Sequence, residues 1–157
     1  MPPITPSLWF DNDLEEAAQF YTSIFPNSTV ERLTRYTEAG PGTPGDVVSG
    51  TLVLDGNRFF GINGGPHHAF TEAISFLVNC TDQGEVDYYW NRLVDGGVES
   101  QCGWLKDRYG VSWQIVPDRL FELLNDPDPA RAAAATKAML GMRRIVIAAL
   151  EDAVRDA

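Results

Sequence analysis

Few residues in this chain carry the side chains that catalysis or metal binding requires. The only two histidines are adjacent, His67 and His68, and the only two cysteines are Cys80 and Cys102. Neighbouring residues on an extended segment point to opposite sides, so the two imidazoles cannot readily share one metal ion. We expect them to be linker residues or hydrogen-bonding groups rather than metal ligands. No neighbouring base is identifiable for a cysteine nucleophile, so free, ordinary thiols are expected.

An internal repeat indicates how the chain positions its side chains. The pattern from Leu8 to Ile24 returns from Leu77 to Leu93, with one constant spacing between all of its paired residues. A second repeat, with a shorter constant spacing, relates Gly56–Ile62 to Gly110–Val116. Each copy alone would bury little surface, so we predict two copies of one module that share a core. Such a duplication usually makes a cleft between the copies.

Each copy is expected to form one strand, one helix and three further strands. In the first copy, Asp13 caps the helix and Asp55-Gly56 joins two strands as a hairpin. In the second, Asp82 caps the helix and Gly96-Gly97 ends it. The expected strands are Ser7–Phe10, Thr29–Tyr36, Val47–Leu54, Arg58–Ile62, Ala73–Cys80, Ser100–Cys102, Trp104–Asp107 and Val111–Val116.

These elements divide a single domain into four segments. Module one spans residues 5–63, a linker 64–72, module two 73–117 and a C-terminal helical extension 118–157. Asp128-Pro129 is typical of a helix start. Residues 143–147 could belong to a helix or form a short strand.

Composition limits the classes of partner. The chain has 157 residues and a formal net charge of −10, which repels nucleic acid and anionic membranes. No stretch approaches the roughly 20 apolar residues that span a bilayer. We therefore predict a cytoplasmic protein with reduced thiols and with neither nucleic acid nor membrane as a partner.

The tandem modules resemble the vicinal oxygen chelate superfamily, which includes glyoxalase I, extradiol dioxygenases and bleomycin-resistance proteins. Four segments resemble its PhnB-like branch, often labelled demethylubiquinone methyltransferase-like: Glu72–Phe76, Glu85–Trp90, Gly103–Asp107 and Tyr109–Pro117. The resemblance implies an α+β fold of two tandem βαβββ modules that form a cleft, plus the C-terminal helical tail. We do not expect methyltransferase activity, because no strand is followed by a glycine-rich turn that would hold S-adenosylmethionine.

The resemblance also implies where a metal would bind: one ligand on the first strand and one on the last strand of each module. The two repeat spacings assign these places to Pro6, Phe60, Ser75 and Gln114. Divalent transition metals prefer imidazole, carboxylate or thiolate ligands. We therefore predict no metal and no other cofactor.

Strand alternation then predicts which side chains face the cleft. If Ser75 and Gln114 face it, so do Leu77, Asn79, Ser112 and Val116, whereas Trp113 and its alternating neighbours face the helix layer. The predicted ligand-binding residues are Phe10, Arg58, Phe60, Ser75, Asn79, Trp104, Ser112 and Gln114. The alternative for each of them is that it fills space between the modules.

Three functions remain open at this point. The first is a metal-independent protein that binds an unknown small organic molecule and sequesters it. The second is an enzyme of lyase, isomerase or oxygenase type that polarises a substrate oxygen with Arg58, Gln114 and Ser75. The third is an assembly domain with a vestigial cleft. The resemblance also implies a homodimer.

Overall fold

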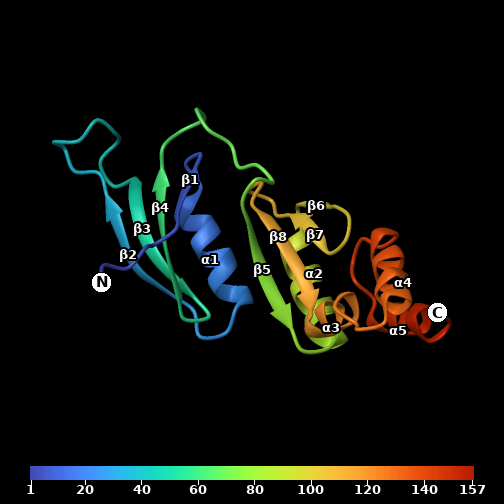
Figure 1. Cartoon of the computed structure of the whole chain (residues 1–157). Helices are drawn as coiled ribbons and strands as arrows, with labels where there is room; N and C mark the ends of the chain where they lie inside the picture. Colours follow the sequence, from blue (N-terminus) through green and yellow to red (C-terminus); the bar gives the residue numbers. More distant parts are fainter. The chain divides into compact units, whose positions relative to one another are not determined.

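The computed structural model describes residues 1–157, which form two compact units, Met1–Phe70 and Thr71–Ala157 (Figure 1). Each unit holds one mixed four-stranded sheet and its own helices. The predicted α+β class and the two tandem βαβββ modules are therefore confirmed. No helix is long and apolar enough to cross a membrane.

The first unit has the predicted order of one strand, one helix and three strands. Its elements are β1 (Ser7–Phe10), α1 (Leu14–Ile24), β2 (Thr29–Arg35), β3 (Val47–Leu54) and β4 (Asn57–Asn63). The sheet order is β1-β4-β3-β2, in which β1 and β4 are parallel and the other pairs antiparallel. The hairpin at Asp55-Gly56 is confirmed, because both residues have the positive φ values, 46° and 78°, that a type I′ turn requires.

The second unit repeats this order. Its module consists of β5 (Ser75–Cys80), α2 (Gln83–Val94), β6 (Val98–Glu99), β7 (Trp104–Lys106) and β8 (Ser112–Pro117), with sheet order β5-β8-β7-β6. Asp82 caps α2 as predicted, by accepting a hydrogen bond from the Glu85 N–H at 2.9 Å.

One strand prediction in this module is wrong. Ser100–Cys102 forms a turn, and the paired strand lies just before it, at Val98–Glu99. Cys102 and Gly103 have φ values of 59° and 86°, which break an extended conformation. Their N–H groups donate to the carbonyls of Met142 and Arg143, so the C-terminal extension fixes this turn.

The C-terminal extension folds as three helices: α3 (Asp118–Leu124), α4 (Pro129–Leu140) and α5 (Ile147–Arg155). Asp128 caps α4 as predicted, accepting from the Ala130 N–H at 3.0 Å. The helices share one apolar cluster made of Val116, Leu120, Leu123, Ala135, Ile145, Leu150 and Val154. This cluster joins the extension to the end of β8.

The segment before α5 is not a strand. Ile145 is fully buried, and its carbonyl accepts a hydrogen bond from the Gln83 side chain at 3.0 Å. The Ile147 N–H donates to the same side chain at 2.9 Å. The side-chain amide of Gln83 thus makes the backbone hydrogen bonds that a neighbouring strand would otherwise make.

Candidate functional site

Pairing within the second sheet places two rows of side chains on one face. Ser75, Ser112 and Lys106 lie side by side in the first row, and Leu77, Gln114 and Trp104 in the second. We call this the open face, and it also carries Asn79. The alternating residues Leu105, Trp113 and Ile115 are buried on the other face, which α2 covers.

A hydrogen bond confirms that Ser75 and Gln114 share the open face. The Gln114 Nε2 donates to the Ser75 Oγ at 2.8 Å. The amide oxygen of Gln114 keeps its capacity to accept a further hydrogen bond. The two residues that the sequence singled out in module two therefore form one polar group on adjacent strands.

A hollow of about 260 Å³ opens on this face beside the paired residues. Apolar, hydroxyl and charged residues line it, and neither Ser75 nor Gln114 is among them: Glu72, Val98, Glu99, Ser100, Trp104, Leu105, Lys106 and Ser112. Trp104 and Ser112 were predicted to bind a ligand, and the structure brings them together here. Small-molecule sites commonly combine an apolar wall with a few polar groups in this way.

Ser112 has an unusual environment within the hollow. The residue is only 1 % exposed, and its Oγ has no hydrogen-bond partner. A buried hydroxyl without a partner costs about 1–3 kcal/mol, so such groups are rare in folded proteins. The Oγ itself is buried, so a ligand oxygen or nitrogen in the hollow would satisfy it only if neighbouring side chains moved aside.

A charged pair borders the same hollow. Lys106 lies directly opposite Ser112 on β7 and forms an ion pair with Glu72. The hydrogen bond from Lys106 lowers the pKa of Glu72. Neither residue was among the predicted site residues. The cross-strand register of β7 and β8, had it been predicted, would have placed Lys106 beside Ser112.

Two residues expected to line the cleft lie elsewhere. Val116 is 3 % exposed and is packed in the apolar cluster of the C-terminal helices, so the extension covers this end of the sheet. Asn79 is exposed on the open face and does not line the hollow.

The prediction for Phe10 is wrong, and the cause is one additional residue. Phe10 is the last residue of β1 and Cys80 the last residue of β5, so the two strands align Phe10 with Cys80. The spacing between the starts of α1 and α2 would instead align Phe10 with Asn79. The additional residue lies in the turn between β1 and α1, where Asn12 has a φ of 64°. A shift of one residue moves every side chain of a strand to the other face. Phe10 is accordingly buried, like Cys80.

The same shift changes the start of α1. The Asp13 side chain makes no capping hydrogen bond, contrary to the prediction. The Leu14 N–H instead donates to the Asn63 side chain at 3.0 Å. Trp9 lies level with Ile62 on the face that also carries Phe60.

The two remaining residues predicted in module one are both solvent-accessible. Phe60 is 37 % exposed. Arg58 donates from Nε and Nη2 to the two carboxylate oxygens of Glu31, at 3.0 and 2.8 Å. This bidentate pair raises the pKa of Arg58 and lowers that of Glu31. Arg58 is therefore already engaged, which weakens its assigned role in polarising a substrate.

The four places implied for metal ligands do not fit a transition metal. Once the additional residue is counted, the counterpart of Ser75 in module one is Thr5 rather than Pro6. The set is then Thr5, Phe60, Ser75 and Gln114, which offers two hydroxyls and one amide. None of these is the imidazole, carboxylate or thiolate that such ions prefer.

One histidine and one cysteine, His68 and Cys80, are packed within the fold. The His68 ring packs edge-on against Trp9, with centroids 4.7 Å apart. Cys80 and Cys102 are free thiols. Burial, with smaller contributions from Glu85 and nearby aspartates, raises the pKa of Cys80 to about 12, so this thiol is unreactive at neutral pH.

Comparison with known proteins identifies the family of this fold. Residues 2–116 match the sequence profile of the 3-demethylubiquinone-9 3-methyltransferase family. The PhnB protein from Bacillus cereus is 36% identical, with a TM-score of 0.68, over 74% of this chain and 99% of its own. No curated protein matches the chain in sequence.

More distant structures share the fold alone. A Pseudomonas aeruginosa protein is 20% identical over 74% of this chain and 98% of its own, with a TM-score of 0.62. The fosfomycin resistance protein FosX from Listeria monocytogenes is 16% identical over 80% of this chain and 98% of its own, with a TM-score of 0.58. The chain thus belongs to the 3-demethylubiquinone-9 3-methyltransferase family, the PhnB-like branch of the vicinal oxygen chelate superfamily.

Proposed function

We propose that this protein binds a small organic molecule on the open face of its second module, without a metal ion. The observation that carries the proposal is the buried Ser112 hydroxyl, which borders the hollow and lacks a hydrogen-bond partner. A group held in this state costs stability unless another molecule satisfies it. A ligand that displaces the neighbouring side chains would supply the missing partner.

The lining of the hollow indicates the kind of molecule. Trp104 and Val98 offer an apolar surface, and Val98 is 65 % exposed. Lys106 offers hydrogen bonds at the edge of that surface, and the Ser75–Gln114 pair lies on the same face outside the lining. A partly aromatic or amphiphilic molecule with one polar end matches this arrangement.

Metal independence rests on the chemistry of the available donors. Two hydroxyls and one amide at the four implied places are poor ligands for zinc, nickel, manganese or iron. The family's methyltransferase description is not part of the proposal, because neither β1 nor β5 is followed by a glycine-rich turn.

Metal analysis of the purified protein tests this part of the proposal. We expect no stoichiometric transition metal. A stoichiometric zinc, nickel, manganese or iron that is lost in Gln114→Ala would overturn it.

A panel of small aromatic and amphiphilic compounds tests the site itself, by saturation-transfer NMR in the presence of EDTA. Trp104→Ala should abolish the signals of bound compounds, because it removes the wall of the hollow. Phe121→Ala is the matched control, since Phe121 is an exposed aromatic residue of the same unit outside the hollow. Equal loss in both variants, or no loss in either, would contradict the assignment.

We also propose, from the family resemblance, that the protein is a homodimer. Light scattering at micromolar concentration should give twice the 17.3 kDa mass of the chain. A mass of one chain would refute this.

A further inference from the structure

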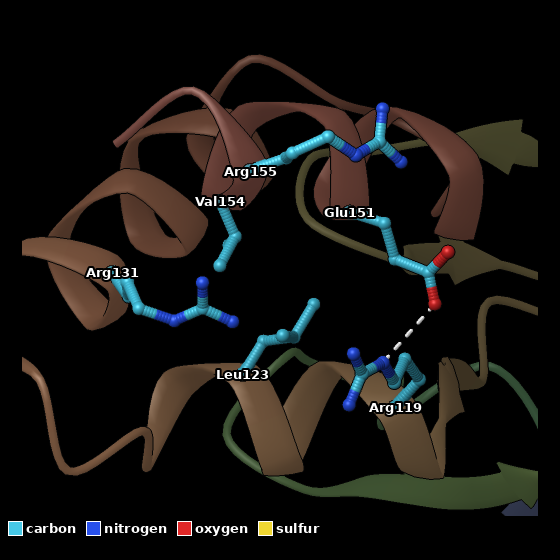
Figure 2. Close-up of a pocket in the computed structure, with 6 residues that line it drawn as sticks. All are labelled: Arg119, Leu123, Arg131, Glu151, Val154 and Arg155. Carbon is cyan, nitrogen blue, oxygen red and sulfur yellow. Dashed lines mark hydrogen bonds and ion pairs between the residues drawn. The ribbon is translucent and has the colours of Figure 1, made fainter.

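The C-terminal helices border a second hollow, open to solvent and of about 280 Å³, that lies outside the region matched by the family profile (Figure 2). Each of α3, α4 and α5 contributes one arginine to its lining: Arg119, Arg131 and Arg155. Glu151 is the only acidic residue in that lining. The chain as a whole has a net charge of −10, and each of these arginines is paired with at least one carboxylate, so the hollow is bordered by ion pairs rather than by an excess of positive charge.

The three arginines leave most of their N–H groups uncommitted. Arg131 donates only from Nε, to Asp126 at 2.9 Å, so both of its terminal nitrogens are available. Arg155 donates from one terminal nitrogen, to Asp152 at 2.8 Å. Arg119 donates from Nε to Glu151 at 3.1 Å and from Nη1 to Glu122 at 2.9 Å, which leaves Nη2. Each guanidinium has five N–H donors in total.

Two apolar side chains, Leu123 and Val154, lie among the polar residues that line the hollow. Figure 2 shows the Arg131 guanidinium reaching towards Leu123 and Val154, which separate it from Arg119. Both apolar residues are nearly fully buried. Charge-assisted hydrogen bonds are stronger beside such a surface than in open water.

We propose that this hollow binds a phosphate group, either as free phosphate or as a small phosphomonoester. Guanidinium groups match phosphate oxygens in geometry and in charge, and often bind them through two parallel hydrogen bonds. The phosphate would take the terminal nitrogens of Arg131 together with the free donors of Arg119, and Arg155, whose guanidinium points away from Arg131 in Figure 2, would have to turn inward to add its own. Glu151 opposes binding, because its carboxylate lies in the same hollow and occupies Arg119.

A purely structural role for the arginines predicts a different outcome. Four carboxylates already pair with them: Glu122, Asp126, Glu151 and Asp152. If these pairs only hold the helices together, neutralising Glu151 loosens the extension and creates no affinity for phosphate. If the hollow binds phosphate, neutralising Glu151 strengthens that binding.

Isothermal titration of the full chain with inorganic phosphate, and separately with glycerol phosphate, tests the proposal at constant ionic strength. We expect saturable binding with a Kd on the order of 1 mM. Tighter binding of glycerol phosphate would identify a phosphomonoester site, and equal binding a site for free phosphate. Absence of saturable binding of both would overturn the proposal.

Variants that change phosphate affinity in opposite directions make the test specific. Arg131→Gln should weaken binding by about tenfold and Arg155→Gln by about threefold, because each removes charge-assisted hydrogen bonds. Glu151→Gln should tighten binding by about threefold. Arg143→Gln is the matched control, an exposed arginine of the same unit outside the hollow. Weaker binding in Glu151→Gln, or equal effects of Arg155→Gln and Arg143→Gln, would refute the site even if Arg131→Gln failed to fold.

Discussion

Replacing Ser112 with alanine should make the protein more stable, although the residue is buried in the sheet. Ser112 is 1 % exposed and its Oγ has no partner, so folding removes the hydroxyl from water without compensation. That loss costs about 1–3 kcal/mol, whereas alanine leaves only a very small void. We expect Ser112→Ala to raise the free energy of unfolding by about 1 kcal/mol, or the Tm by roughly 2–4 °C for a chain of this length.

Ser75 provides the matched control, because it lies beside Ser112 on the neighbouring strand. Its Oγ accepts the hydrogen bond from Gln114 Nε2 at 2.8 Å, so Ser75→Ala breaks an existing interaction. The free energy of unfolding should fall by about 0.5–1.5 kcal/mol. Two serines on one face of one sheet should therefore change stability in opposite directions.

Urea denaturation followed by far-UV circular dichroism measures both changes. Equal m values would show that each substitution acts on stability and not on the extent of unfolding. The reasoning is refuted if Ser112→Ala destabilises the protein as much as Ser75→Ala does, since Ser112 would then make a hydrogen bond in the folded state.

Further predictions concern the thiols, the turn before α1 and its packing. In the native protein Ellman's reagent should modify Cys102 and spare the buried Cys80, and both should react in urea. Folding raises the pKa of Cys80 from 9.0 to about 12, so between these pH values the unfolded chain loses the thiol proton and the folded protein keeps it. The free energy of unfolding should therefore fall as the pH rises from 9.0 to 12. The fall should be smaller in Cys80→Ala. Asn12→Ala should destabilise by about 1 kcal/mol in thermal melts, and Asn12→Gly should not, since the φ of 64° strains a residue with a Cβ. Gly61→Ala should cost about 1–3 kcal/mol, because its Cβ would overlap the Leu14 side chain; an unchanged Tm would show that α1 can move away.

The two modules could be predicted from the sequence repeat. Strands and helices follow from local residue types, so two stretches with the same pattern form the same elements. It could not predict the faces of β1, since one additional residue near Asn12 reverses them while leaving the helix pattern intact. A single spacing between the copies assumes equal turns, and therefore misplaces Phe10 and Pro6. In module two, where no such difference arises, Ser75 and Gln114 were placed correctly on one face.

Side chains that depend on tertiary contacts were harder to predict. Val116 follows the alternation of Ser112 and Gln114 along β8, but the extension covers it from a segment far along the chain. Lys106 and Glu72 meet only because β7 lies beside β8 and residue 72 precedes β5. Neither arrangement leaves a pattern in the local sequence, so the hollow itself could not be derived from it.

The central claim is that the open face of module two binds a small organic molecule without a metal ion. Proton–nitrogen NMR of the labelled protein, screened with small aromatic and amphiphilic compounds in excess EDTA, tests it most directly. We expect binding compounds to shift the indole N–H signal of Trp104 and the amide signal of Ser112. Metal-free binding at this face is ruled out if no compound shifts these signals, or if shifts arise only after a divalent metal is restored.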